Sequence, residues 1–478
     1  MKKMSTVLMM APCRRMRYNI SDLYPLPRLG IGSISAFLKE AGYNQTKIWD
    51  IIAEKKWIPE ILEAFKNGVC PDLLGISATL LSMKEAFEIA ESVKNQFPHI
   101  HIVLGGPGVS FPAEVLFEYG KGVDFYIRGE GEESFVQLIR CLDTMASDLS
   151  SVPGLIWKNQ QGKIIENPSG KFRDLDDGIM SDYSSMPMQK YQLHPPMGIY
   201  PPAVILETAR GCSYSCTFCC IPRKVRFKNP VLVEKEIIRL KKQFGINEIH
   251  FVDPTFTLDS ARTEEMTGRI QKLDIKWSCK TRVDLTDFSL LKKMADSGCY
   301  LISFGVESAA ESILNDLDKK IMISQTNETF MNCRSLRIRT AAYLMIGNPG
   351  ETDDTVKLNI QFVRQLQPDY VLYGILQPDP ASQLTHDMIR KGFFSEKDLY
   401  RYYLSDEDNY FQDHTVCGLP LKTVQDWIRK ASRGFYLRPG YVVRRLTDLR
   451  SIQDLINLGA GGLTFMKDFM GLGRLWKQ

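Results

Sequence analysis

The segment CSYSCTFCC, residues 212–220, places four cysteines within nine positions. Cys212, Cys216 and Cys219 follow the spacing C-x3-C-x2-C, directly after a strand-like run, VILET (204–208). Three thiolates on one tight loop suit three corners of an iron–sulfur cubane and leave the fourth iron without a protein ligand. The segment therefore predicts an iron–sulfur site at the end of a strand.

Three other interpretations of the cysteine loop are a zinc site, catalytic or redox thiols without a metal, and a chance clustering of cysteines. A structural zinc site normally needs a fourth Cys or a His from a second spaced pair, and no second C-x2-C pair follows in the sequence. Cys220 is adjacent to Cys219, and neighbouring side chains in a tight loop rarely converge on one metal, so we expect Cys220 to lie outside the site.

The cysteine loop follows the first of six strand-like runs that alternate with helical patterns. Six successive βα units predict a parallel sheet that curls like part of a barrel, with its chemistry at the carboxyl ends of the strands. The runs are residues 204–208, 247–253, 275–283, 300–308, 339–347 and 369–376.

A second alternating pattern covers residues 1–145. Its strand-like runs are continuously apolar, as expected for strands buried on both faces, and they predict a doubly wound parallel sheet. In such a sheet, ligands bind outside the carboxyl ends of the strands. The expected strands are residues 5–11, 46–52, 73–78, 101–106 and 123–129; the expected helices lie near 31–41, 57–67, 83–97, 112–119 and 132–143.

Two further regions complete the predicted organisation. Residues 146–203 contain a hairpin pattern, LIWKNQQGKIIENP, followed by a stretch rich in Pro, Met and Ser, and we interpret this region as a linker. Residues 377–478 are more helical and richer in Tyr, Arg and Lys, and their sequence assigns them no chemistry.

Composition excludes several classes of protein. The net charge of +4 is spread over 478 residues without a long Lys/Arg run, so we expect no nucleic-acid partner. No stretch approaches 18 uninterrupted apolar residues, so we expect no membrane span. The 11 cysteines are odd in number and mostly scattered, which indicates a reducing, cytoplasmic location and no disulfide framework.

The stretch ARGCSYSCTFCC closely resembles the cluster loop of radical S-adenosylmethionine (SAM) enzymes, with Phe218 as the aromatic residue before the last ligand. The resemblance implies a [4Fe-4S] cluster on Cys212, Cys216 and Cys219 whose open iron is chelated by SAM. Electron transfer from the cluster then cleaves SAM to a 5′-deoxyadenosyl radical. The resemblance also implies an electron donor such as flavodoxin or ferredoxin.

Two further strand ends resemble the SAM-holding motifs of this family. Lys280 and Arg282 end the third barrel strand, where basic groups suit the SAM carboxylate; they also fit as surface-facing charges. Ser303 and Glu307 lie in the fourth strand, SFGVES, where a carboxylate suits the ribose hydroxyls. The alternative for Glu307 is a cap on the following helix.

The fifth and second strand ends carry the remaining resemblance. In LMIGNPGE (344–351), Gly347 permits close backbone approach to the adenine and Pro349 fixes the turn, although a plain strand-to-helix turn has a similar sequence. FVDPTFT (251–257) resembles a recurrent segment of the cobalamin-using subgroup. Its Asp253 either faces the active site or caps a turn.

The first domain resembles the cobalamin-binding domain fused ahead of many radical SAM barrels, although a nucleotide, a flavin or no ligand fits a doubly wound sheet as well. The similar segments are residues 24–42, 75–82, 103–108 and 128–132. The implied contacts are Ser77 and Thr79 on the nucleotide tail, Gly105, Gly106 and Pro107 along its slot, and Gly129 and Glu130 at the edge.

Residues 12–30 contain no His, whereas many cobalamin domains present one to cobalt from this loop. We therefore expect no protein imidazole on the lower face of cobalt. Arg28 and Leu29 lie in the loop expected to face that side.

The resemblance as a whole implies an α/β chain. Its parts are a Rossmann-like cobalamin-binding domain (1–145), a linker with a hairpin (146–203), a partial (β/α)6 radical SAM barrel (204–376) and a helical C-terminal region (377–478). The implied activity is methylation of an unactivated carbon of a small-molecule, lipid or peptide substrate through methylcobalamin. Ring contraction or cyclisation with the same cofactors, and a cobalamin-binding regulator with a degenerate barrel, are the alternatives.

Overall fold

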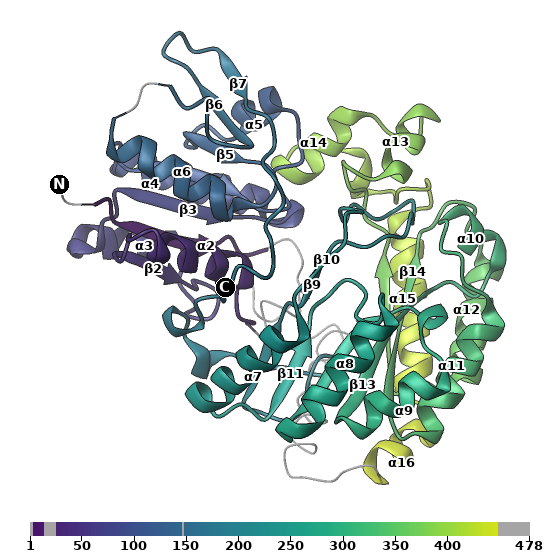
Figure 1. The fold of residues 1–478 in the computed structure, drawn as a ribbon. Coiled ribbons are helices and arrows are strands. Elements are labelled where there is room, and N and C mark those ends of the chain that lie inside the picture. The colour runs from purple at the N-terminus through teal and green to yellow at the C-terminus, as the bar shows by residue number, and fades with distance from the viewer. Residues whose placement is uncertain (1–2, 14–24, 146–147, 448–478) are drawn as a thin grey trace. The chain divides into compact units, whose positions relative to one another are not determined.

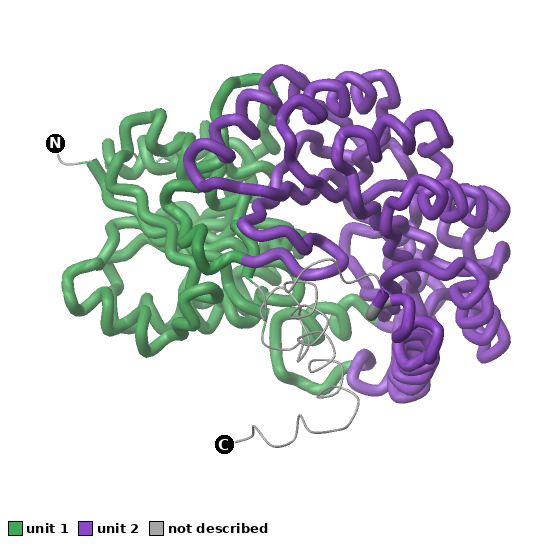
Figure 2. Tube along the Cα trace, turned by 90° about the horizontal axis from the view of Figure 1, so that it is seen from below, with its two compact units in different colours: residues 1–191, 395–409 green, residues 192–394, 410–478 purple. Residues whose placement is uncertain are grey.

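The computed structural model describes residues 3–13, 25–145 and 148–447. The chain divides into two compact units, which Figure 2 colours separately. The first unit consists of Met1–Tyr191 and Ser395–Asn409, and the second of Gln192–Phe394 and Tyr410–Gln478.

The first unit contains a seven-stranded sheet with the order β2-β1-β3-β4-β5-β6-β7. The five strands expected from the apolar runs are confirmed, and they are parallel to one another. The strands are β1 (Thr6–Met10), β2 (Thr46–Trp49), β3 (Leu73–Ser77), β4 (His101–Gly105), β5 (Phe125–Ile127), β6 (Leu155–Lys158) and β7 (Ile164–Glu166).

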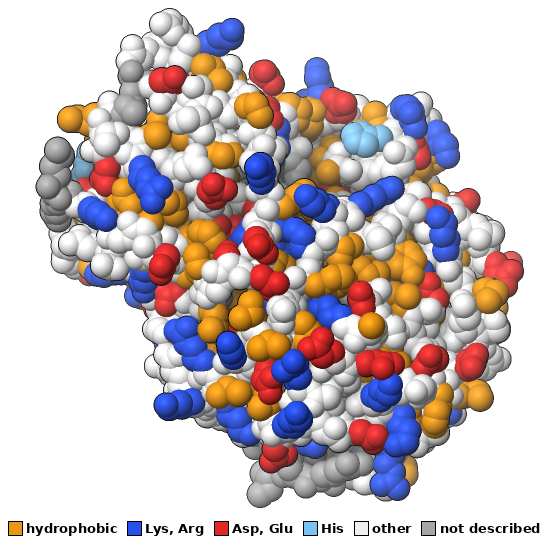
Figure 3. Space-filling view, in the orientation of Figure 1, with side chains coloured by type: hydrophobic (Ala, Val, Ile, Leu, Met, Phe, Trp, Pro, Cys, Tyr) orange, Lys and Arg blue, Asp and Glu red, His pale blue; other side chains and the backbone are white. Residues whose placement is uncertain are grey.

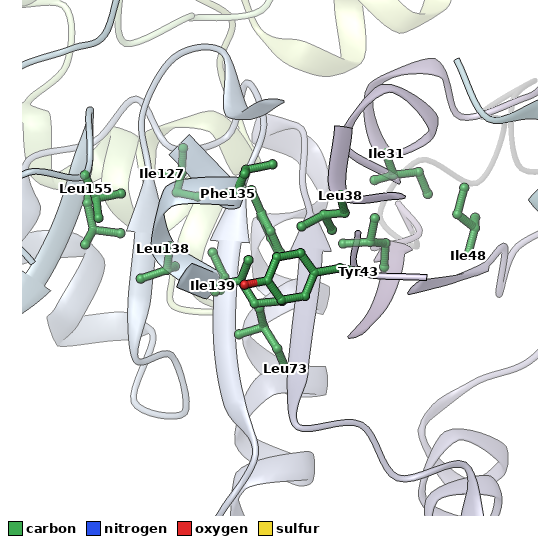
Figure 4. Close-up of a cluster of buried hydrophobic side chains, with 14 of the residues drawn as sticks. Ile31, Leu38, Tyr43, Ile48, Leu73, Ile127, Phe135, Leu138, Ile139 and Leu155 are labelled. Carbon is green, nitrogen blue, oxygen red and sulfur yellow. The ribbon is translucent and has the colours of Figure 1, made fainter. Parts of the chain in front are cut away.

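Four helices connect the five parallel strands, as expected, and a fifth follows the last of them. They are α2 (Leu29–Glu40), α3 (Ile58–Ala64), α4 (Met83–Gln96), α5 (Ala113–Tyr119) and α6 (Gly131–Asp143). The helices α2 and α6 contact each other on one face of the sheet. Figure 4 shows Leu38 of α2 and Phe135, Leu138 and Ile139 of α6 in the core between these helices and the sheet.

The expected hairpin forms between β6 and β7, but it is not part of a linker. β6 pairs antiparallel with β5, so the hairpin extends the sheet of the first unit. Asn167 fixes its base: the side chain accepts from Trp157 Nε1 at 3.3 Å and donates to the Leu149 and Val152 carbonyls at 2.7 and 2.8 Å. The sheet therefore continues past residue 145, the predicted boundary.

A C-terminal segment completes the first unit. Residues 395–409 contain α14 (Glu396–Leu404), which packs on α4. The fully buried ring of Phe111 lies 5.9 Å from the Tyr400 ring and 6.0 Å from the Tyr403 ring. The sequence assigned this segment to a separate C-terminal region, because the aromatic contact joins residues almost 300 positions apart.

The second unit contains a six-stranded parallel sheet with the order β15-β14-β13-β12-β11-β8, as the six runs predicted. Its strands are β8 (Ala203–Leu206), β11 (Glu248–Phe251), β12 (Lys276–Thr281), β13 (Cys299–Glu307), β14 (Arg339–Ile346) and β15 (Tyr370–Ile375). A short antiparallel ribbon, β9 (Ala209–Arg210) with β10 (Arg226–Phe227), follows the first strand.

The helices of the second unit follow the strands in turn (Figure 1). They are α7 (Pro230–Phe244), α8 (Ser260–Ile270), α9 (Phe288–Asp296), α10 (Glu311–Asp316), α11 (Ile323–Ser335), α12 (Asp353–Leu366), α13 (Gln383–Arg390), α15 (Leu421–Tyr436) and α16 (Pro439–Thr447). None of the helices that the structure describes is both long and apolar enough to cross a membrane.

Alternation along the strands separates the two faces of this second sheet. Phe251 and Trp277 point toward the helices, and Trp277 Nε1 donates to the Ser297 carbonyl at the end of α9 at 3.0 Å. The opposite face is polar: Glu248 and His250 are buried there, one position away from the apolar side chains. This polar face forms the interior of the partial barrel.

Candidate active site

The cysteine loop leaves the sheet at the carboxyl end of β8 and runs between β9 and β10. Gly211 starts it with φ +88°, and an added Cβ would lie 2.2 Å from the Lys224 carbonyl oxygen, so only glycine fits there. The loop closes on itself because Cys212 N donates to the Pro222 carbonyl at 3.0 Å and Cys219 N to the Cys216 carbonyl at 3.1 Å.

The thiols of the loop lie close to one another and to cations. Burial raises the pKa of Cys216 and of Cys219, and the neighbouring thiols raise both pKa values further, while Lys319 opposes this effect at each. Arg282 Nη1 lies 3.8 Å from Cys216 Sγ, and Cys212 Sγ lies 3.5 Å from Thr255 Oγ1. Positive charge beside these thiols suits thiolates that ligate iron.

Arg282 is held by several partners at once. Its guanidinium bonds to Asp284 through Nε at 2.9 Å and Nη2 at 3.0 Å, donates to the Lys319 carbonyl at 2.6 Å and lies 3.6 Å from the centre of the Tyr214 ring. Burial alone lowers its pKa, but the Asp284 carboxylate outweighs burial and raises it. Arg282 therefore joins the end of β12 to the cysteine loop, where it contacts Cys216.

Glu307, at the end of β13, is paired with a residue that the sequence did not indicate. Its carboxylate accepts from Lys319 Nζ at 2.7 Å, and both side chains are buried. Glu307 adopts φ +60°, a conformation unusual for a non-glycine residue. Lys319 follows α10 in an ordinary polar stretch, DLDKK, which contains no motif that would have identified it.

Lys280 and Ser303 lie side by side, since they are register partners of β12 and β13. Burial lowers the pKa of Lys280, and Asp253 partly opposes this shift. Among the described residues the Lys280 ammonium group has no hydrogen-bond or ion-pair partner. A half-buried, unpaired cation at a strand end suits an anionic group of a ligand.

The turn after β14 contains a glycine in the left-handed region and two buried acceptors that lack hydrogen-bond partners in the described residues. Gly347 has φ +93°, and its N–H and that of Asn348 donate to Glu351 Oε2 at 2.5 and 3.0 Å. Glu351 Oε1 and Asn348 Oδ1 are buried and accept no hydrogen bond from the described residues. Buried acceptors of this kind need donors, and the hydroxyl and amino groups of a nucleoside supply them. Pro349 lies within the same turn.

The remaining candidates of the barrel are placed as follows. Phe218 packs against Ala310, Ile313 and Leu317, next to Met345. Asp253 is fully buried and accepts from Thr208 N at 2.6 Å and Ala209 N at 2.9 Å, so it caps the turn after β8, the second of its two expected roles. Cys220 is exposed, and its Sγ lies 2.9 Å from Asp379 Oδ2.

In the first unit, the candidate glycines lie at the carboxyl ends of β4 and β5. An added Cβ at Gly106 (φ +95°) would lie 2.7 Å from the Ala78 carbonyl oxygen, whereas at Gly105 the nearest atom is 3.7 Å away. At Gly129 (φ +92°) nothing lies within 4 Å. Pro107 follows these glycines and its carbonyl accepts from Ser110 Oγ at 2.8 Å. This edge is therefore lined by backbone, as a large flat ligand requires.

Two polar candidates of the first unit are engaged within the protein. Glu130 Oε2 accepts from Arg173 N at 2.8 Å. Thr79 N donates to Ser82 Oγ at 3.0 Å in a capping arrangement before α4. Ser77 ends β3, and its Oγ lies 2.8 Å from the position that a Cβ on Gly106 would take, so Ser77 faces the same edge as Gly106.

The described residues contain no group of three His, Cys, Asp or Glu side chains placed to bind a single metal ion. The donors that the cysteine loop offers are three thiols on a folded loop beside two cations, and this donor set fits a cluster of several irons. The barrel candidates come from the ends of β8, β12, β13 and β14, which meet at one edge of the sheet.

Family models match both units. The model of the radical SAM superfamily matches residues 206–363, and the model of the B12-binding domain matches residues 18–139. The chain is 29% identical to an uncharacterized methyltransferase of Pyrococcus horikoshii, over 87% of this chain and 89% of that protein.

Two further curated relatives differ in their named reactions. One is the cytidylyl-2-hydroxyethylphosphonate methyltransferase of Streptomyces wedmorensis, 26% identical over 79% of this chain and 82% of that protein. The other is the anaerobic magnesium-protoporphyrin IX monomethyl ester cyclase of Cereibacter sphaeroides, 26% identical over 76% of this chain and 60% of that protein.

Solved structures share the fold. The radical SAM methyltransferase TsrM of Kitasatospora setae, solved with cobalamin and a [4Fe-4S] cluster, gives a TM-score of 0.67 at 16% identity over 82% of this chain and 78% of that one. The cobalamin-dependent radical enzyme OxsB gives 0.63 at 21% identity over 88% of this chain and 58% of that one.

The barrel and its cysteine loop define a radical SAM enzyme. With the B12-binding domain ahead of the barrel, this chain belongs to the cobalamin-binding radical SAM enzymes, whose cofactors are a [4Fe-4S] cluster, SAM and cobalamin.

Proposed function

We propose that this protein is a methyltransferase that modifies an unactivated carbon of a small-molecule, lipid or peptide substrate. The observation that carries the proposal is the combination in one chain of the three-cysteine loop at the carboxyl end of a radical SAM barrel with a B12-binding sheet. When bound, the cluster and SAM supply a radical that removes hydrogen from carbon, and cobalamin supplies the methyl group.

The residues of the barrel hold and position these groups. Cys212, Cys216 and Cys219 bind the cluster. Arg282 keeps a positive charge at Cys216, and Lys319 provides a second cation while neutralising Glu307. Lys280 offers its unpaired ammonium to the carboxylate of SAM.

The fifth strand end and the first unit supply the remaining contacts. Gly347 lets the adenine approach the backbone, next to the acceptors of Asn348 and Glu351. Ser303 and Phe218 border the same space, with Pro349 fixing the turn. In the first unit, cobalamin lies at the carboxyl ends of the parallel strands. The residues that line this edge are Ser77, Thr79, Gly105, Gly106, Pro107, Gly129 and Glu130.

The proposal is tested by anaerobic reconstitution of the full chain with iron, sulfide and cobalamin. We expect a cubane absorption spectrum, reductive cleavage of SAM to 5′-deoxyadenosine, and transfer of the isotopically labelled SAM methyl group to the bound cobalamin. The absence of both the cubane spectrum and SAM cleavage would contradict the enzymatic function. Cleavage without methyl transfer to cobalamin would contradict the methyltransferase proposal alone.

Ring closure without methyl transfer is the second candidate function. The 26% identity to a magnesium-protoporphyrin monomethyl ester cyclase favours it, although this chain spans 60% of that protein. The mass of the product separates the two reactions, because methylation adds one labelled methyl group and cyclisation adds none.

The cellular setting forms part of the same proposal. We infer a cytoplasmic enzyme that receives electrons from a flavodoxin or ferredoxin, because a low-potential cluster needs a protein donor in a reducing compartment. On the face drawn in Figure 3, basic and acidic side chains are intermingled, which supports the absence of a nucleic-acid partner.

A further inference from the structure

The second unit has a cavity at the end of the barrel opposite the cysteine loop. Its volume is about 350 Å³, which lies within the range of small-molecule sites. Tyr300, Arg339 and Asp369 lie at or just before the amino ends of β13, β14 and β15, whereas the cluster candidates lie at carboxyl ends. Figure 1 shows α16, which carries Arg444, at the far end of this unit from β9 and β10. The cavity is therefore separate from the radical site.

The charge of this cavity is strongly positive. Four arginines line it, Arg334, Arg337, Arg339 and Arg444, against one carboxylate, Asp369, a formal excess of three positive charges. Asp369 Oδ2 already accepts from Thr340 N at 2.8 Å. Across residues 3–13, 25–145 and 148–447, none of the four arginines forms an ion pair.

Only some of the hydrogen-bond donors of the Arg444 guanidinium have a partner in the described residues. Nη2 donates to the Pro368 carbonyl at 2.9 Å and Nη1 to the Gln367 carbonyl at 3.4 Å, while Nε is buried and has no partner in the described residues. These carbonyls are neutral, so the charge of Arg444 is not compensated. An uncompensated, partly buried cation is costly unless an anion joins it.

Two further arginines, Arg364 and Arg438, add positive charge to that of Arg444. Burial lowers the pKa of Arg438, and the positive charges of Arg444 and Arg364 lower it further. Like charges gathered in this way repel each other, and a bound polyanion relieves the repulsion.

The remaining wall of the cavity is aromatic and apolar. Phe330 and Ile338 are buried in it, and the rings of Tyr200 and Tyr300 meet edge to face with their centres 4.9 Å apart. Beside these rings, an organic group finds apolar surface while its charged end meets the arginines. A single carboxylate would neutralise only one of the three excess charges, whereas phosphoryl groups carry two or more and match the forked donors of Arg.

We propose that this cavity binds an organic phosphate, a small molecule in which a phosphate or pyrophosphate group is joined to an apolar or aromatic part. The phosphate lies between Arg339 and Arg444, and the organic part lies against Tyr200, Tyr300 and Phe330. The site is distinct from the cysteine loop and from the SAM-holding strand ends.

Calorimetric titration of the reconstituted full chain tests this site, with inorganic pyrophosphate, adenosine diphosphate and citrate as probes. We expect saturable binding of both phosphates, tighter binding of adenosine diphosphate than of pyrophosphate, and weaker binding of citrate. Arg339→Gln and Arg444→Gln should each weaken pyrophosphate binding about tenfold, the loss of one charge-assisted hydrogen bond. Arg269→Gln, on α8, is the matched control and should bind pyrophosphate like the parent.

Three outcomes would overturn the proposal. The first is the absence of saturable binding by either phosphate. The second is an equal loss of affinity in Arg269→Gln, which would show a general charge effect. The third is unchanged affinity in both Arg339→Gln and Arg444→Gln, which would place binding elsewhere, for example at the SAM site. Melting temperatures of all variants identify any that fail to fold; if either pocket variant fails, Arg337→Gln at the exposed rim replaces it, with the same expected loss.

Discussion

Two cysteines four positions apart, Cys216 and Cys220, provide a direct test of the cluster assignment. Cys216→Ala should lose the cubane spectrum and SAM cleavage, because it removes one of three iron ligands. Cys220→Ala should retain both, since the Cys220 thiol lies 2.9 Å from Asp379 Oδ2 and is not needed as a ligand. Iron content, absorption spectra and 5′-deoxyadenosine yield measure the difference. Loss of the cluster in both variants would show that Cys220 takes part in binding.

Arg282 is expected to act through the cluster and not on the substrate. Arg282→Gln removes the positive charge 3.8 Å from Cys216 Sγ and should make the reduction potential of the cluster more negative. We expect SAM cleavage to fall about 10- to 100-fold, as for other residues that support metal ligands. Arg282→Lys retains the charge but loses the fork to Asp284, so its potential should shift less. Equal potentials in all three proteins would limit Arg282 to a structural role.

Glu248, inside the barrel, should make stability depend on pH. Burial raises its pKa from 4.5 to about 7, although the Tyr300 hydroxyl and two backbone N–H groups oppose the shift. The folded protein therefore binds a proton that the unfolded chain releases, and the stabilisation is complete below pH 4.5 and lost as the pH rises to 7, about 3 kcal/mol at most. Glu248→Gln should flatten this part of the curve of unfolding free energy against pH. A variant curve parallel to that of the parent would assign the dependence to other groups.

Two adjacent glycines, Gly105 at the end of β4 and Gly106 directly after it, should respond differently to substitution. Gly106→Ala requires φ +95° and brings the Cβ within 2.7 Å of the Ala78 carbonyl, so it should cost about 1–3 kcal/mol and weaken cobalamin binding. Gly105→Ala meets nothing closer than 3.7 Å and should fold with the stability of the parent. Denaturant unfolding and equilibrium dialysis with cobalamin measure the two effects. Equal stability of the two variants would contradict the backbone argument.

Strands and turns of both units follow from local sequence, whereas the partners of site residues do not. The apolar runs located the eleven parallel strands, and the spacing of Cys212, Cys216 and Cys219 located the loop, because each depends on residues that are neighbours in the chain. The contacts of Lys319 with Glu307 and Arg282 join different strand ends. No local pattern encodes such a contact, and for the same reason the sequence did not place the hairpin of β6 and β7 in the first sheet.

Residues 395–409 bring the chain back to the first unit. The contacts of this segment should contribute much of the stability of that unit. Tyr403 is buried against Phe111. Tyr403→Ala should therefore destabilise the first unit by about 3 kcal/mol or more. Tyr402→Ala, half-buried in the same helix, is the control and should cost clearly less. Hydrogen exchange of the β3 and β4 amides reports the stability of this unit. Equal protection in both variants would contradict the role of the contact.

This return of the chain also sets an order for folding during synthesis. A nascent chain that has emerged only as far as residue 394 contains the whole of the first sheet, yet Phe111 still lacks its cover from Tyr400 and Tyr403. Because domains generally fold as they leave the ribosome, the first unit must wait for most of the second to be translated before it is complete. Ribosome-bound chains should therefore gain resistance to protease in the first unit only after residue 409 has cleared the exit tunnel.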